Sequence, residues 1–203
     1  MINGFISVPY GTILRCKLMK LIDFNKVRDG RFLKNYELKY INKADKEKSF
    51  EIVSYNDYSD VSEIGKKCSG VSIIALSSDH EKMLILKEFR MGVNKEIYNL
   101  CAGRLEKDES VEECVKRELM EEAGLTVTKI LAILPPSYAA VALSDVMNQI
   151  AIVEVSGEPT GKNTSDNEQI FPKMYTKEEA RELIKNCQFT SRAQLATYYF
   201  SLK

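Results

Sequence analysis

The segment Gly103–Leu125, GRLEKDESVEECVKRELMEEAGL, decides the fold class of this 203-residue chain. Its central part, residues 109–124, has the length and polarity of a surface helix packed on a sheet. Gly124 ends this helix, because glycine readily adopts the left-handed backbone conformation that follows a helix end.

One stripe of the predicted helix starts apolar and ends acidic. At about 100° per residue, Val111, Val115, Glu118 and Glu122 fall on the same narrow face. If the two valines pack on a sheet, the two glutamates reach the edge of that sheet on the same side.

The carboxylates at the end of this helix require a cation if they are partly buried, since like charges at this spacing repel one another. Glu121 lies beside Glu118 and Glu122 in the sequence. Arg117 lies within helical reach of Glu113 and Glu121 and predicts a guanidinium brace. The other carboxylate oxygens suit Mg²⁺ or Mn²⁺, which prefer oxygen ligands. The alternative is an acidic helix end that water solvates.

The flanking sequence predicts strands and two further helices, and therefore an α+β protein. The second helix begins with a capping box, in which Glu179 stands three residues after Thr176. The predicted strands are residues 36–42, 49–55, 70–77, 83–90, 96–103, 129–134 and 148–155, and the predicted later helices are residues 177–187 and 191–202.

The composition excludes several functional classes. Lys and Arg total 29, as do Asp and Glu, so no global charge attracts the protein to nucleic acid or to an anionic membrane. The five cysteines, one of them Cys16, form no C-x-x-C pair and predict reduced thiols in a cytoplasmic protein. Polar and charged residues interrupt every apolar run near the N-terminus, so we expect neither a signal peptide nor a membrane span. His80 is the only histidine and lies in a turn-like stretch, which argues against a histidine-activated nucleophile.

The spacing G-x5-E-x7-R-E-L-x-E-E-x-G-L, from Gly103 to Leu125, resembles the Nudix box at every defining position. The resemblance implies a Nudix-type α/β/α sandwich with a mixed sheet. We expect an N-terminal antiparallel β lobe at residues 1–62, which would make substrate and dimer contacts, and a catalytic domain at residues 63–203.

The resemblance also implies a chemistry in which Mg²⁺, or Mn²⁺, neutralises a diphosphate and activates a water molecule. Glu121 would bind metal or accept a proton, and Arg117 would support the site. The expected metal ligands are Glu118, Glu121, Glu122 and the backbone carbonyl of Ala102.

Outside the box, the chain is similar to the branch of ADP-ribose and nucleoside-diphosphate-sugar pyrophosphatases, from about Phe32 onward. A strand ending in Phe-Arg precedes the box in that branch, and here Arg90 ends such a strand. Arg90 would contact a substrate phosphate or a nearby carboxylate, and Gly103 would line the substrate site. Phe50 and Glu51 would contact adenine. On the residues alone, Arg90 could equally be a surface arginine and Phe50 a core residue.

The loop at residues 156–171 is the expected source of a catalytic base. The resemblance assigns that role to Glu168, with Asp166 as a rival two residues away.

Three departures leave the substrate open: Val141-Ala142-Leu143-Ser144-Asp145-Val146 replaces the usual specificity loop, Asn99 replaces a glutamate, and Tyr55 replaces an arginine. We expect a small-molecule nucleoside diphosphate derivative as the partner, and a homodimer. The alternatives are a non-catalytic Nudix module that senses such a ligand and a Nudix enzyme that acts on other nucleotides.

Overall fold

The structure is a computed structural model that describes residues 18–202. Contacts divide these residues into two compact units, so each unit is described by itself. The first comprises residues 18–64 together with Ala140–Asp145, and the second comprises Gly65–Ala139 and residues 146–202. Cys16 lies outside the described residues.

The first unit is a three-stranded antiparallel sheet in the order β1-β2-β3, followed by a short 3-10 helix, η1. The second and third strands confirm the predicted hairpin. The first strand was not predicted, because charged residues interrupt its apolar pattern and most of its side chains are exposed. The elements are β1 (Lys20–Asp29), β2 (Lys34–Ile41), β3 (Glu47–Ser54) and η1 (Val61–Glu63).

Aromatic side chains form the small core of this unit. Tyr36 is fully buried and stacks on Phe24 with 4.9 Å between ring centroids. The backbone N–H of Tyr58 donates to the Tyr36 hydroxyl at 2.7 Å, and the Tyr58 hydroxyl donates to Asp145. Asp145 thus ties part of the expected specificity loop to the first unit, which the strand pattern could not reveal.

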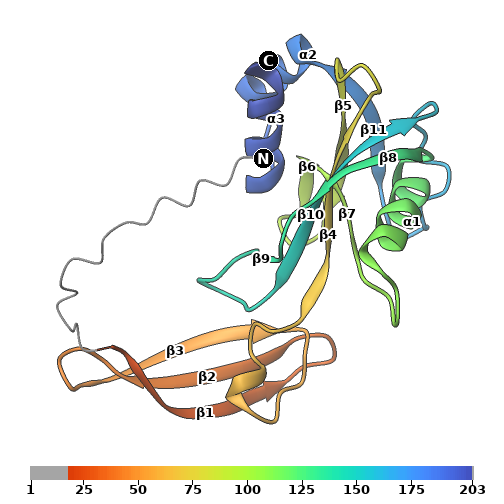
Figure 1. Ribbon diagram of the computed structural model, residues 1–203. Coiled ribbons are helices and arrows are strands. Elements are labelled where there is room, and N and C mark those ends of the chain that lie inside the picture. The colour runs from red at the N-terminus through yellow and green to blue at the C-terminus, as the bar shows by residue number, and fades with distance from the viewer. Residues whose placement is uncertain (1–17, 203) are drawn as a thin grey trace, which may run out of the picture. The chain divides into compact units, whose positions relative to one another are not determined.

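The second unit contains a mixed eight-stranded sheet whose main path runs β11-β5-β4-β10-β8. β10 pairs with β4 in parallel and with β8 in antiparallel orientation. In Figure 1, α1 lies on one side of this sheet and α3 on the other. The strands are β4 (Cys68–Leu76), β5 (Lys82–Arg90), β6 (Lys95–Asn99), β7 (Cys101–Arg104), β8 (Thr126–Ile133), β9 (Ser137–Tyr138), β10 (Met147–Ser156) and β11 (Ile170–Thr176).

One strand prediction was wrong, and one strand of the main sheet path was not predicted. The predicted strand 96–103 is two strands separated at Leu100, because β6 pairs with β5 whereas β7 pairs with β4. β11 was not predicted at all, since Pro172 interrupts its pattern. It stands at the end of the sheet path, where a proline that lacks an N–H is tolerated.

The helices α1 (Val111–Ala123), α2 (Lys177–Asn186) and α3 (Ser191–Leu202) confirm the predicted helical segments. The Ser110 side chain accepts from the Glu113 N–H, while the Glu113 side chain accepts from the Ser110 N–H. Gly124 has φ 64°, the left-handed conformation expected after the helix. Of the helices in residues 18–202, none is both long and apolar enough to cross a membrane.

The main core lies between α1 and the sheet. Val115 and Leu119 of α1 are fully buried against strand residues such as Val71, Leu84 and Val153. This packing confirms the apolar half of the predicted stripe and fixes the direction in which the acidic half points.

Candidate active site

Glu118 and Glu122 lie one helical turn apart on the buried face of α1, where the helix packs against β7. Glu118 is 8% exposed and Glu122 is 9% exposed. The Ala102 backbone N–H, on β7, donates to Glu122 Oε2 at 3.1 Å. The structure therefore brings three of the expected metal ligands, Ala102, Glu118 and Glu122, to one place.

Gly103 makes this close packing possible. A Cβ built at Gly103 would overlap the side chain of Glu118. The absence of a side chain at this position lets the Glu118 carboxylate lie directly on β7. This close approach explains why the Gly103–Leu125 motif begins with a glycine.

Arg117 forms the predicted brace, but with partners that differ in part from the prediction. Its Nε and Nη2 donate to the two oxygens of Glu109 at 2.8 and 3.0 Å. Its Nη1 donates to Glu118 at 2.7 Å and to Glu121 at 3.2 Å. The expected contact with Glu113 was wrong, because Glu113 is used by the capping box. A bidentate pair holds a guanidinium plane in one orientation.

Burial sets the electrostatics of the carboxylates. It raises the pKa of Glu122 to about 8, although hydrogen bonds from Cys101 and Ala102 act in the opposite direction. Burial also raises the pKa of Glu118, against the opposing effect of Arg117. Two buried acids at adjacent positions disfavour each other's charge, and a nearby cation would favour the ionised forms of both.

Glu122 opens onto a hollow of about 320 Å³ at the end of β5. Arg90 and Glu168, both singled out in the sequence, line the same hollow. The side chain of Glu168 accepts from the N–H and hydroxyl of Ser165, which shapes the loop before β11. The rival acid Asp166 is not among the residues that line this hollow.

Glu88 is a further acid in this hollow that was not predicted. It is 4% exposed and accepts from Asn99 Nδ2 at 2.7 Å. Burial raises the pKa of Glu88, while Asn99 and Arg90 lower it. A single glutamate in a strand carries no periodic or spacing signal, so sequence reasoning had nothing with which to find it.

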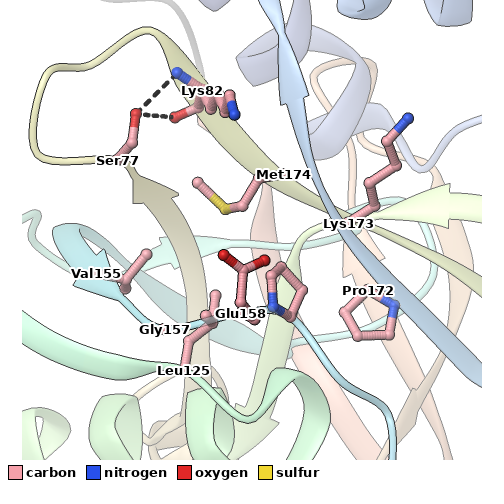
Figure 2. A pocket seen from close by; sticks show the side chains of 10 residues that line it. Ser77, Lys82, Leu125, Val155, Gly157, Glu158, Pro172, Lys173 and Met174 are labelled. Atoms are coloured by element: carbon pink, nitrogen blue, oxygen red, sulfur yellow. Dashed lines mark hydrogen bonds between the residues drawn. The ribbon is translucent and has the colours of Figure 1, made fainter.

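Two of the larger hollows in the second unit lack this chemistry. Figure 2 shows one of about 490 Å³, where Glu158 is the one acid among the lining residues and the Lys173 ammonium points away. The other, of about 670 Å³, lies along α3 and is lined mostly by apolar side chains, with no carboxylate among them. Chemistry, rather than volume, therefore identifies the candidate site.

The expected adenine contacts lie in the first unit, on β3. Phe50 is 40% exposed, so it is not the core residue that a half-buried strand allowed. Glu51 is also exposed, and it pairs with Glu37 across the β2–β3 ladder.

The donor set fits a hard divalent cation, which takes carboxylate and carbonyl oxygens. In the arrangement described for residues 18–202, no three His, Cys, Asp or Glu side chains converge on one point as a complete metal site. Arg117 and the Ala102 N–H hold the acidic oxygens instead. The carboxylates would have to turn from these partners toward a metal, which their flexible side chains allow.

Comparisons with known proteins agree on the region and the fold. The family model described as the NUDIX domain matches residues 66–195. The ADP-ribose pyrophosphatase of Bacillus subtilis (strain 168) is 29% identical over 143 residues, which cover 70% of this chain and 76% of that protein. A crystal structure of an ADP compounds hydrolase has a TM-score of 0.67 at 15% identity and covers 91% of this chain and 92% of its own. At that identity, the structural likeness concerns the fold.

Proposed function

This chain belongs to the NUDIX domain family and is a Nudix pyrophosphohydrolase, and we propose that its substrate is ADP-ribose or a related nucleoside-diphosphate sugar. The products would be a nucleoside monophosphate and a sugar phosphate. We further propose that the reaction requires Mg²⁺, with Mn²⁺ as a substitute.

The observation that carries this proposal is the pair of buried carboxylates, Glu118 and Glu122, of which Glu122 lines the same hollow as Arg90. Buried carboxylates are costly unless a cation accompanies them. Arg90 adds a positive charge to this hollow. A diphosphate is negatively charged, so such a site can hold it only through cations.

The proposed ligands of the metal are Glu118, Glu121, Glu122 and the Ala102 carbonyl. When bound, a divalent cation would neutralise the diphosphate and lower the pKa of an attacking water. Arg117 keeps Glu118 oriented, and Gly103, which we also assign to the substrate site, leaves room for the Glu118 carboxylate against β7.

Proton transfer from the attacking water is assigned to Glu121 or Glu168. Glu121 has a half-exposed side chain on α1, and Glu168 lines the hollow from a polar loop. Either carboxylate can accept a proton without a covalent intermediate.

In the first unit, we assign the adenine contacts to Phe50 and Glu51. An exposed aromatic ring can stack on a base, and a carboxylate can accept from an exocyclic amine.

We also propose a homodimer, which light scattering would refute by giving a strict monomer mass. The described cysteines, Cys68, Cys101, Cys114 and Cys187, are free, which supports a reducing cytoplasmic location.

A substrate panel with Mg²⁺ or Mn²⁺, scored for release of AMP from ADP-ribose, tests the substrate. The panel includes dinucleotides and oxidised nucleotides, whose preferential cleavage would favour the alternative specificity. Binding of ADP-ribose without turnover would favour a sensing module.

The metal assignment is tested with Glu122→Gln, which removes charge and keeps volume. We expect turnover to be nearly abolished while the thermal midpoint is retained, because burial already disfavours the ionised form of this residue. If the variant turns over like the parent protein, Glu122 binds no essential metal.

A further inference from the structure

We propose that Glu88 is a positioning residue, held by Asn99 and Thr190, that aims the Arg90 guanidinium at a phosphate of the substrate. The inference deepens the proposed function, because it takes the diphosphate as the group that Arg90 receives. It assigns roles to three residues for which the sequence analysis had none.

A chain of short contacts runs from the start of α3 to the hollow. The Thr190 hydroxyl donates to Asn99 Oδ1 at 2.6 Å, and Asn99 Nδ2 donates to Glu88 Oε1 at 2.7 Å. The second oxygen of Glu88, Oε2, lies 3.6 Å from Arg90 Nη1. Thr190, Asn99 and Glu88 are thus joined by hydrogen bonds, and the ion pair between Glu88 and Arg90 ends the row.

Thr190 is itself anchored by the backbone. Its N–H donates to the Tyr98 carbonyl at 3.0 Å, and its carbonyl accepts from Gln194 at 2.9 Å as α3 begins. An ionised Glu88 only accepts hydrogen bonds and therefore requires the Asn99 amide nitrogen, which leaves the amide oxygen to accept from the Thr190 hydroxyl. The same hydroxyl accepts from the Ala193 N–H at 3.4 Å.

Asn99 satisfies one oxygen of Glu88 but supplies no charge. A buried carboxylate needs a cation as well as a hydrogen bond, and Arg90 is the cation that its free side faces. The side chain of Glu88 is 5% exposed whereas that of Arg90 is 58% exposed, so the acid is the fixed partner and the arginine the movable one.

The arginine keeps donors for a ligand. A guanidinium has five N–H groups in one plane, and the pair with Glu88 engages the Nη1 end. Tethering that end restricts where the rest of the plane can point, and the hollow shared with Glu122 lies beside it. A preoriented guanidinium binds phosphate with a smaller loss of side-chain entropy.

The first test uses Glu88→Gln, which keeps the acceptor for Asn99 and removes the charge that holds Arg90. We expect KM for ADP-ribose and Kd for inorganic pyrophosphate, both measured at the same Mg²⁺ concentration and the latter by calorimetry, to rise about tenfold. We expect kcat to change less than about threefold. The matched control is Glu96→Gln, which breaks the exposed 2.6 Å pair with Lys87 on the same two strands.

A double-mutant cycle separates a role through Arg90 from a direct role. If Glu88 acts by positioning, Glu88→Gln has no further effect on pyrophosphate Kd when Arg90 is already alanine. A tenfold effect that persists in the Arg90→Ala background would overturn the proposal, as would an unchanged Kd in Glu88→Gln alone.

The contact between Thr190 and Asn99 is tested separately. Thr190→Val removes the donor to Asn99 and should weaken pyrophosphate binding about threefold, whereas Thr190→Ser keeps the donor and should restore it. A purely structural role of Thr190 would lower the thermal midpoint and leave Kd unchanged, and that result would also overturn the proposal.

These measurements distinguish the inference from the proposed function. If the protein hydrolyses no nucleoside-diphosphate sugar but Glu88→Gln still weakens pyrophosphate binding through Arg90, the substrate assignment fails and the positioning role stands. If the unaltered protein binds no pyrophosphate, Arg90 is not a phosphate ligand and the inference fails.

Discussion

Gly103→Ala is the change that most directly tests the geometry of the candidate site. The added Cβ would overlap the Oε1, Cδ and Cγ atoms of Glu118. These atoms belong to the movable end of a side chain, so Glu118 should swing away from β7 while α1 keeps its place. The displacement would also break the 2.7 Å contact between Arg117 and Glu118.

The structure suggests different magnitudes for stability and for catalysis. Overpacking costs about 1–3 kcal/mol, and the lower end applies where a flexible side chain can yield. A loss of about 1 kcal/mol lowers Tm by roughly 2–4 °C for a protein of this size. Moving a catalytic group by about 1 Å can reduce turnover on the order of 10²-fold, equivalent to about 2.7 kcal/mol in the transition state. Catalysis should therefore suffer more than folding.

The assay pairs kcat for ADP-ribose at saturating Mg²⁺ with urea unfolding of the metal-free protein. Gly92→Ala is the control for stability, because a Cβ there meets nothing within 4 Å and should leave the free energy of unfolding unchanged. If Gly103→Ala retains the kcat of the parent protein, Glu118 does not act from its position against β7.

Three further predictions concern the core, the loss of stability at low pH and the first unit. Leu119→Ala should lower the free energy of unfolding by about 2–5 kcal/mol in urea denaturation, because Leu119 is fully buried between α1 and the sheet. Arg117 holds the pKa of Glu109 at about 2, below its ordinary value of 4.5, so this group stabilises the fold above pH 4.5 and the contribution disappears as the pH falls through about 2. In Arg117→Met, the free energy of unfolding, followed by circular dichroism, should therefore fall less between pH 4.5 and about 2 than it does in the parent protein. The same fall in both proteins would contradict the ion pair. Phe50→Ala should raise KM for ADP-ribose about tenfold with little change in Tm, since the ring is 40% exposed, and an unaltered KM would remove Phe50 from the adenine site.

The sequence alone predicted what depends on neighbouring residues. The helix over residues 109–124, its end at Gly124 and the capping box at Thr176 all depend on contacts within one or two turns. The Nudix spacing belongs to the same class, since its glutamates lie on one helix. This is why the family resemblance and the helix face that carries Glu118 and Glu122 could be predicted from the sequence.

Only the tertiary structure decided the contacts between segments that are distant in the chain. On the helix, Glu113 and Glu121 both lie within reach of Arg117. Glu113 is used by the capping box, and the preceding loop brings Glu109 to Arg117 in its place. Glu88, Asn99 and Thr190 meet because β5, β6 and the start of α3 lie side by side. Such contacts have no period or spacing in the sequence, since strand pairing and helix packing join residues through space.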